Sequence, residues 1–359
     1  MNLFDGIYSE RRVLLTGHTG FKGSWLALWL HELGAKVLGV ALPPDGKDSH
    51  WISLGLNIAE KQIDIRQANI LADAARTFAP EIVFHLAAQP LVRRSYRDPL
   101  TTWETNVIGT ANLLEICRHI PSVRAIVVVT TDKCYENREW EWGYREIDRL
   151  GGHDPYSASK AGAELVAASY RRAFFEANNG PLLATARAGN VIGGGDWSED
   201  RLIPDLARAM GANRPLVIRS PHATRPWQHV LESLSGYLLL GQHLLERRVG
   251  SAEAWNFGPG PDGNRRVEEM LELLRRDWPA LSWRLDPNPG PHEATLLQLD
   301  CAKAHRKLGW RPVWSLDKGL TATAAWYRDW LNERRLLTRE QLAAYIQDAR
   351  ESGATWALS

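Results

Sequence analysis

The sequence predicts an α/β protein with a Rossmann-type doubly wound parallel sheet and a smaller C-terminal α/β substrate-binding domain. Three observations predict this class: a glycine-rich turn between a strand and a helix near the start, apolar strands that alternate with helices, and glycines and prolines that interrupt this alternation after residue 190. We expect residues 1–190 to bind a dinucleotide and residues 191–359 to form most of the second domain. A segment around residues 228–258 is expected to return to the first domain.

Composition excludes several classes of protein. The 359 residues carry a net charge of +1, so no basic field indicates nucleic acid or an anionic membrane as a partner. Residues 1–12 lack an apolar core of signal-peptide length, and the most apolar helix candidate, residues 24–33, contains His31 and Glu32. Three cysteines without metal-type spacing indicate neither disulfides nor a metal site. We therefore expect a cytoplasmic protein whose many tryptophans mostly fill the core, while a few, such as Trp227 beside Arg225, line a pocket.

The first strand and helix enclose a turn suited to a pyrophosphate. A strand over residues 12–15 leads into Thr16-Gly17-His18-Thr19-Gly20-Phe21-Lys22-Gly23, and a helix is expected over residues 24–33. The spacing of Gly17, Gly20 and Gly23 is similar to the glycine fingerprint of dinucleotide-binding folds, although the first two glycines stand farther apart than in the plain Rossmann form. Backbone amides at a helix N-terminus favour an anion. The alternative is an ordinary glycine-rich turn.

The second and third strands leave the choice of dinucleotide open. The second strand is expected over residues 36–40, but the next acid is Asp45, and no arginine follows the strand to bind a 2′-phosphate. NAD and NADP therefore both remain possible at this point. Ile63-Asp64-Ile65 is expected to close the third strand, where Asp64 either bonds the adenine amino group or caps a helix.

Small residues follow the fourth strand, where the backbone passes close to a cofactor. That strand, residues 81–86, ends at Ala87-Ala88-Gln89. The helix over residues 100–118 has one broad apolar face, and its Asn106 is either a cofactor ligand or a structural polar contact. A sixth strand is expected over residues 182–186.

The segment between the fifth strand and the next helix gathers the chemistry-bearing side chains. The fifth strand, residues 125–129, is a continuous apolar run typical of a strand buried on both faces. Thr130, Thr131, Asp132 and Lys133 follow it directly. Because ligands of such sheets bind at the carboxyl ends of the strands, we expect these side chains to face the site.

The helix that follows, residues 155–178, is expected to begin at Pro155 with Asp154 as its cap. Tyr156 and Lys160 then share one face. The ammonium is expected to lower the pKa of the phenol from about 10, so that the tyrosine exchanges a proton with a sugar hydroxyl while a nicotinamide takes the hydride. The alternative is an amphipathic helix with one exposed lysine.

The second half of the chain carries the phosphate-binding candidates. Short strands are expected at residues 216–219 and 283–285, and residues 316–359 read as two amphipathic helices. Four basic side chains suited to a substrate phosphate occur between residues 201 and 229. A solvated basic surface is the alternative. The four basic side chains are Arg201, Arg219, Arg225 and His229.

Taken together, these motifs resemble the extended short-chain dehydrogenase/reductase family, whose members include NAD-dependent epimerases and dehydratases. Residues 131–137, 151–160 and 221–229 are most similar to the members that dehydrate CDP-glucose. Related dTDP-glucose dehydratases carry Asp-Glu where this chain has Asp132-Lys133, so a glutamate base cannot be transferred to it.

The resemblance implies an NAD-dependent hydro-lyase of deoxysugar and O-antigen precursor biosynthesis. It would oxidise C4 of a nucleotide-sugar, eliminate water across C5 and C6, and return the hydride to C6. Asp132 would be the acid at the C6 hydroxyl, and Lys133 would be the C5 base or merely orient O6. The resemblance also implies a homodimer, or a homotetramer, that packs the helices of residues 100–118 and 155–178. A different nucleotide-sugar dehydratase, a 4-epimerase and an NAD-sensing binding protein are the rival readings.

The implied site residues fall into three groups. The catalytic group is Thr131, Asp132, Lys133, Tyr156 and Lys160. The NAD-binding group is Gly17, Thr19, Gly20, Phe21, Gly23, Asp64, Ile65, Leu86, Ala87, Ala88, Gln89, Asn106, Thr130, Tyr156, Lys160 and Ala188. The nucleotide-sugar group is Gln89, Asn190, Arg201, Leu202, Arg219, Arg225 and His229.

Overall fold

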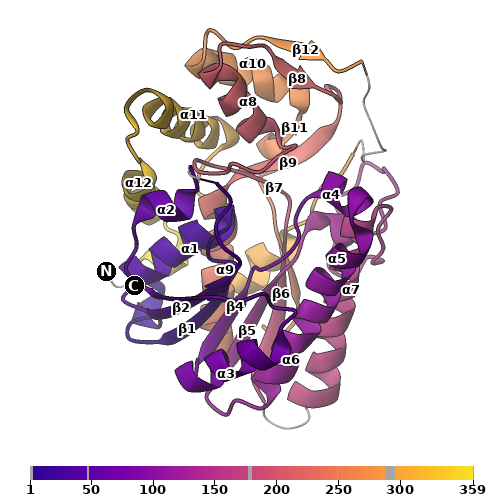
Figure 1. The fold of residues 1–359 in the computed structure, drawn as a ribbon, viewed down its shortest axis with the longest axis vertical. Helices are drawn as coiled ribbons and strands as arrows, with labels where there is room; N and C mark the ends of the chain where they lie inside the picture. The colour runs from indigo at the N-terminus through magenta and orange to yellow at the C-terminus, as the bar shows by residue number, and fades with distance from the viewer. Residues whose placement is uncertain (1–2, 47, 177–179, 249, 288–295, 359) are drawn as a thin grey trace.

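A seven-stranded parallel sheet forms the centre of the molecule (Figure 1). The computed structural model describes residues 3–46, 48–176, 180–248, 250–287 and 296–358. The strand order is β10-β6-β5-β4-β1-β2-β3, so the chain runs outward from β1 to one edge and then returns to build the other. The predicted doubly wound fold is confirmed. The strands are β1 Arg12–Thr16, β2 Lys36–Ala41, β3 Ala59–Gln62, β4 Ile82–His85, β5 Ala125–Val129, β6 Leu182–Ala188 and β10 Ala254–Phe257.

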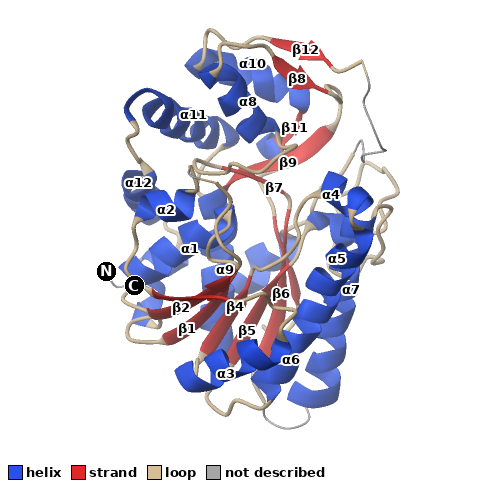
Figure 2. Ribbon diagram, in the orientation of Figure 1, coloured by secondary structure: helices blue, strands red, loops and turns tan. Residues whose placement is uncertain are grey.

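Helices cover both faces of this sheet (Figure 2). One face packs against apolar side chains of α3, α6 and α7, and the other against α1 and α9; α11 and α12 belong to the same apolar cluster as α1 and α9. Each layer buries the apolar stripe of its helices, which is why the intervening strands are apolar on both sides. These helices are α1 Phe21–Glu32, α3 Ala68–Phe78, α6 Gly109–Arg118, α7 Pro155–Tyr170, α9 Val230–Leu245, α11 Leu316–Glu333 and α12 Thr338–Glu351.

A second region lies beside the carboxyl ends of the strands and forms the upper part of the view in Figure 1. It contains a three-stranded sheet in the order β11-β9-β7 and a parallel pair, β12-β8. Its elements are β7 Asn190–Ile192, α8 Leu202–Gly211, β8 Leu216–Ile218, β9 Thr224–His229, β11 Asn264–Arg266, α10 Val267–Asp277 and β12 Trp283–Leu285. Three short helices, α2 His50–Leu54, α4 Val92–Arg97 and α5 Pro99–Trp103, complete the chain.

The segment predicted to return to the large sheet includes α9 and β10. β10 pairs in parallel with β6, with Ala254 opposite Thr185. Every side chain of α9 is buried, as expected for a helix enclosed on all sides. The division of the chain into domains at residue 190 stays a prediction.

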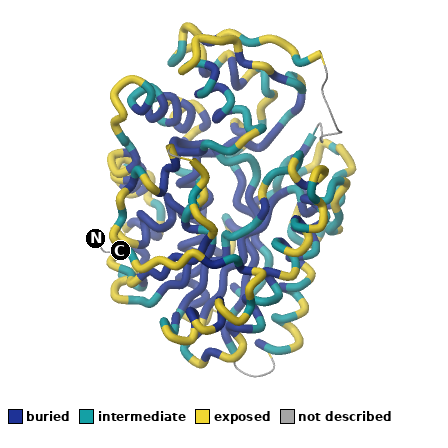
Figure 3. Tube along the Cα trace, viewed as in Figure 1, coloured by how far each residue is buried: buried dark blue, intermediate teal, exposed yellow. Residues whose placement is uncertain are grey.

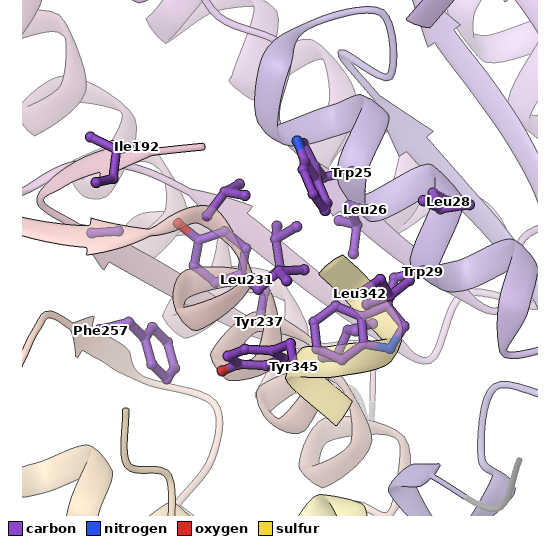
Figure 4. Close-up of a cluster of buried hydrophobic side chains, with 14 of the residues drawn as sticks. Trp25, Leu26, Leu28, Trp29, Ile192, Leu231, Tyr237, Phe257, Leu342 and Tyr345 are labelled. Carbon is purple, nitrogen blue, oxygen red and sulfur yellow. The ribbon is translucent and has the colours of Figure 1, made fainter. Parts of the chain in front are cut away.

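Aromatic side chains dominate the core on the α1 and α9 side of the sheet. Figure 4 shows Trp25 and Trp29 of α1 with Tyr237 of α9, Phe257 of β10 and Tyr345 of α12. All five are fully buried, and Figure 3 shows the buried interior continuing through the sheet. This agrees with the prediction that most tryptophans fill the core. Among the described residues, no helix combines the length and apolarity that crossing a bilayer requires.

Several predicted boundaries differ from the structure. The third strand is β3, residues 59–62, because β2 pairs with it up to Gln62, whereas Ile63 and Ile65 lie beyond the pairing and are buried. The helix expected at residues 24–33 begins at Phe21, because Gly20 already serves as its cap.

Two of the predicted long helices contain π-helical turns. The helix predicted over residues 100–118 is α5, a π-helical segment over Glu104–Ile108, and α6. The helix predicted over residues 155–178 is α7 followed by a π-helical segment over Arg171–Phe175, and its last two residues lie outside the described residues. A π-helical turn accommodates one extra residue, which periodicity alone does not signal.

Candidate active site

A cavity of about 1390 Å³ opens at the carboxyl ends of the strands, between the large sheet and the second region. It is lined by the glycine loop, by the segments that follow β4 and β5, by the start of α7, and by residues of β7, α8, β8 and β9. Ligands of doubly wound sheets bind at this edge. Nearly all of the predicted site residues line this cavity; the exceptions are Asn106 and His229.

The glycine loop provides a close backbone approach and a helix N-terminus. Gly17 has a φ of +78°, and a Cβ there would lie 2.7 Å from the amide nitrogen of Ala87. A Cβ at Gly23 would lie 2.0 Å from the carbonyl oxygen of Gly17, so only glycine lets α1 pack on the loop. The loop and the first turn of α1 line the cavity, and a helix N-terminus at this place fits a dinucleotide pyrophosphate.

The adenosine end of the predicted cofactor site contains a paired acid. The Asp64 carboxylate accepts hydrogen bonds from the Arg66 side chain, one of them 2.6 Å long, and this bonding lowers the pKa of Asp64. Asp64 and Asp45 both line the cavity. The role of Asp64 toward adenine stays a prediction.

Asn106 does not reach the cavity, because its amide is engaged on both sides. Its Oδ1 accepts from the backbone N–H of Gln89 at 2.8 Å, and its Nδ2 donates to the Gln89 carbonyl and to Ser159 Oγ. The side chain is 1% exposed. Asn106 is therefore the structural contact that the sequence left as an alternative, and it holds the backbone of Gln89 at the cavity wall.

The helix bearing Tyr156 and Lys160 starts where the sequence predicted. Asp154 caps α7 by accepting from the backbone N–H of Ser157, and Pro155 occupies the first turn. The Tyr156 N–H donates to Ser95 Oγ of α4 at 3.1 Å. This bond ties the start of α7 to α4.

The pKa of Tyr156 differs from the prediction, and burial also shifts the pKa of Lys160. Burial raises the pKa of Tyr156 to about 12, although a hydrogen bond with Thr131 and the charge of Arg201 act in the opposite direction. Burial lowers the pKa of Lys160 to about 8, against the charge of Glu164. The Lys160 ammonium donates to the Val129 carbonyl at 3.2 Å. The expected lowering of the tyrosine pKa is therefore wrong for this structure, because desolvation outweighs the neighbouring cation.

Asp132 presents a carboxylate oxygen to the cavity wall. Thr131 caps the short 3₁₀ turn Asp132–Cys134, and its hydroxyl donates to Asp132 Oδ1 at 2.9 Å. Asp132 is 1% exposed, and its Oδ2 has no hydrogen-bond partner among the described residues. A buried polar atom without a partner is costly, so this oxygen is suited to a ligand hydroxyl. Lys133 lines the same cavity.

The second region contributes three arginines to the cavity, and two of them pair with acids of the same region. Arg201 precedes α8 and forms an ion pair with Asp196 at 3.0 Å. Arg219, which directly follows β8, pairs with Asp200 at 2.8 Å. Arg225 of β9 is 6% exposed and donates to the Thr224 carbonyl.

The wall on this side also includes Asn190 at the start of β7, Leu202 at the start of α8, and Trp227. The presence of Trp227 agrees with the prediction that a few tryptophans line a pocket.

His229 lies away from the predicted substrate site. It caps α9, and its ring packs against Trp25 and Trp314. It lines a separate cavity of about 320 Å³ instead. The basic residues between positions 201 and 229 predicted a phosphate ligand. His229 is the last residue of β9, however, and its ring lies in the aromatic core.

Lys22 is a cavity residue that sequence reasoning missed. It follows Phe21 in the first turn of α1, and its ammonium donates to Tyr237 Oη at 3.2 Å. Burial first, and then the charge of Arg201, lowers the pKa of Lys22 to about 7. The sequence signal that could have identified Lys22 is its position between Gly20 and Gly23 of the glycine loop.

Comparisons with known proteins agree with this geometry. The family model described as GDP-mannose 4,6 dehydratase matches residues 14–323. The CDP-glucose 4,6-dehydratase of Salmonella typhimurium is 48% identical over 348 residues, which cover 94% of this chain and 97% of that protein.

Solved structures resemble the chain along most of its length. The dTDP-glucose 4,6-dehydratase of Streptomyces venezuelae, with NAD bound, is 28% identical and superimposes with a TM-score of 0.72 over 89% of this chain and 97% of that one. The UDP-glucose 4-epimerase of Thermotoga maritima, with UDP-glucose, is 25% identical, with a TM-score of 0.79 over 89% and 100%. On the family model and the relative at 48% identity, the chain belongs to the GDP-mannose 4,6-dehydratase family of extended short-chain dehydrogenases/reductases.

Proposed function

We propose that the chain is an NAD-dependent CDP-glucose 4,6-dehydratase, a hydro-lyase that converts CDP-glucose to CDP-4-keto-6-deoxyglucose and water. The observation that carries the proposal is its 48% identity to a CDP-glucose 4,6-dehydratase over 94% of the chain. The gathering of Tyr156, Thr131 and Asp132 around one cavity supports it chemically.

The cavity offers a cradle for NAD. The bare backbone at Gly17 and the N-terminus of α1 would hold the pyrophosphate, and Lys160 and Tyr156 would meet the nicotinamide end. NAD, when bound, supplies the acceptor for the C4 hydride and the donor that returns it to C6. No net oxidation of the substrate results.

Tyr156 and Thr131 act on the C4 hydroxyl. The Tyr156 phenolate takes the O4 proton as C4 is oxidised, and Thr131, which already bonds this side chain, also bonds O4. Because burial raises the pKa of Tyr156 to about 12, the phenolate needs nearby positive charge; Arg201 supplies part of it, and Lys160 lines the same cavity.

Asp132 and Lys133 act on C6 and C5. The C4 ketone acidifies the C5 proton, which Lys133 removes as the neutral amine, while the protonated carboxyl of Asp132 gives its proton to the departing C6 hydroxyl. The unpartnered Oδ2 of Asp132 supports the acid role. A simple 4-epimerase needs no acid at C6, so this oxygen favours a dehydratase over an epimerase.

Incubation with a panel of nucleotide-sugars tests the proposal. CDP-, dTDP-, GDP- and UDP-glucose are each supplied with NAD, and the product is identified by NMR. We expect a 4-keto-6-deoxy product with CDP-glucose at least tenfold faster than with the others. A C4 epimer, or no product from any of the four, would contradict the assignment.

We further propose a cytoplasmic homodimer. Leu100 and Trp103 of α5, Ile108 of the π-helical segment before α6, and Leu165 of α7 expose apolar side chains. An exposed apolar patch of this kind supports a protein interface. Three buried free thiols are consistent with a reducing compartment. Light scattering is expected to give twice 40.4 kDa. A monomer or a tetramer would contradict the dimer.

A further inference from the structure

A buried ion pair joins α7 to β6, one helical turn from Lys160. The Glu164 carboxylate of α7 accepts two hydrogen bonds from Arg187 of β6, from Nε at 2.9 Å and from Nη2 at 2.8 Å. Both side chains are 3% exposed, and neither lines the cavity. Desolvation offsets much of the attraction in such a pair, and apolar side chains of similar volume are often no less stable. Stability alone therefore does not account for an ion pair at this place.

The Glu164–Arg187 pair bonds both ends of the segment that follows β5. At one end, the Thr130 hydroxyl donates to Glu164 Oε1 at 2.5 Å. At the other end, Arg187 Nη1 donates to the Tyr135 hydroxyl at 2.8 Å, and the guanidinium carbon lies 4.9 Å from the centre of the Tyr135 ring. The residues between these two ends are Thr131, Asp132, Lys133 and Cys134. The groups proposed to act on O4, C6 and C5 therefore lie on a segment that one ion pair holds at both ends.

The same pair joins this segment to the helix that carries the other proposed catalytic groups. Lys160 Nζ donates to the Val129 carbonyl, and Glu164, one turn later on α7, accepts from Thr130. Two successive turns of α7 therefore bond two successive residues at the end of β5. Because a misplacement of about 1 Å between reacting groups can slow a reaction about a hundredfold, the spacing of these two elements bears directly on the rate.

We propose that Glu164 and Arg187 are positioning residues for the reaction, whose ion pair holds the segment 130–135 at a fixed place against α7. This inference deepens the proposed function and rests on it, because the acid and the base on this segment are those assigned to the dehydration. Both residues act through the groups that they hold. Loss of the bond at Tyr135 releases one end of the segment, so it slows the chemistry without weakening the binding of the nucleotide.

Two hydroxyl groups that bond this ion pair offer a matched comparison. Tyr135 is 1% exposed, and its hydroxyl accepts from Arg187 and donates to Asn256 Oδ1 at 2.7 Å. Tyr135→Phe therefore removes a bond to the pair and takes no unengaged hydroxyl from a ligand. The Thr185 hydroxyl of β6 donates to Glu164 Oε2 at 2.8 Å, but Thr185 neither lines the cavity nor belongs to the segment. Thr185→Val removes a bond of the same kind and keeps the shape of the side chain.

Steady-state kinetics of the whole chain with CDP-glucose and NAD, together with calorimetric titration with CDP, test the positioning role. We expect Tyr135→Phe to lower kcat about tenfold or more and to keep the Kd for CDP within about twofold. Thr185→Val should keep both quantities within about twofold, because the bond that it removes does not hold the segment.

A second variant tests whether the effect passes through the ion pair. Arg187→Lys keeps the positive charge beside Glu164 but lacks the planar fork that also reaches Tyr135, so we expect the same loss of kcat. Adding Tyr135→Phe to it should cost less than about a further twofold, because the bond is already missing. Thermal melts check that each variant is folded, and Arg187→Lys carries the test if Tyr135→Phe is not.

The outcomes separate positioning from a purely structural role. A smaller fall of kcat in Tyr135→Phe, or an equal fall in Thr185→Val, would mean that the pair only stabilises the fold, which overturns the proposal. Weaker CDP binding with an unchanged kcat would make Tyr135 a ligand contact and overturns it too. Wild-type chain that forms no 4-keto product from any of the four nucleotide-sugars would refute the proposed function itself, and the positioning role would fall with it.

Discussion

The cofactor side and the substrate side of the cavity are built from different materials. On the cofactor side, apart from the Asp64–Arg66 pair at the adenosine end, backbone atoms form much of the wall: the turn at Gly17, the start of α1, and the backbone of Gln89 fixed by Asn106. On the substrate side, charged side chains form it, and they are held by ion pairs such as Arg201 with Asp196 and Arg219 with Asp200. A backbone wall has its shape before a ligand arrives, whereas a wall of ion pairs must exchange partners to bind an anion.

Changing Tyr156 tests the point where the two sides meet. Tyr156→Phe removes the group that moves the O4 proton, so we expect kcat to fall about a thousandfold. Tyr170→Phe, at the last residue of the same helix α7, is the control and should keep kcat within twofold, because Tyr170 does not line the cavity. Retention of a tenth or more of the activity by Tyr156→Phe would exclude the catalytic role.

A methyl group on the glycine loop tests how rigid the backbone wall is. Gly17→Ala places a Cβ 2.7 Å from the Ala87 nitrogen in a left-handed conformation, so the free energy of unfolding should fall by about 3 kcal/mol, and NAD binding should fall with it. Gly353→Ala is matched in φ at +74° but meets nothing within 4 Å, and should cost about 1 kcal/mol. Equal losses in denaturant titrations would mean that the close approach at Ala87 is not needed.

The acid assigned to C6 gives the next largest effect. Asp132→Asn keeps the shape and the bond from Thr131 but cannot supply a proton, so we expect dehydration to slow about a hundredfold. Binding of CDP, measured by calorimetry, should change less than twofold. If dehydration ran at the normal rate, Asp132 would not be the acid.

Lys22 is an exception to this contrast, because it is a buried cation on the cofactor side of the cavity. Its pKa is lowered to about 7, below that of a lysine in the unfolded chain. Between pH 7 and 10 the unfolded chain therefore binds more protons than the folded chain, so the free energy of unfolding of wild type rises with pH over this range. Lys22→Met should lack this gain, which we expect to be about 2 kcal/mol after allowance for solvent in the cavity. Parallel pH dependences in urea titrations of the two proteins would contradict the lowered pKa.

Sequence reasoning succeeded where a local pattern determines the structure. The glycine loop, the apolar run of β5 and the cap at Asp154 each follow from neighbouring residues, and the doubly wound sheet follows from their order. It failed for properties that depend on distant contacts. The burial that raises the pKa of Tyr156, the aromatic contacts that enclose His229, and the bond from Arg187 to Tyr135 all join segments far apart in the chain.

The most direct measurement follows the hydrogen on C4 of CDP-glucose. With substrate deuterated at C4, the account predicts deuterium at C6 of the 4-keto-6-deoxy product, one solvent hydrogen at C5, and NAD recovered unchanged after many turnovers. A product without deuterium at C6, or NADH formed mole for mole with product, would contradict the return of the hydride to the sugar.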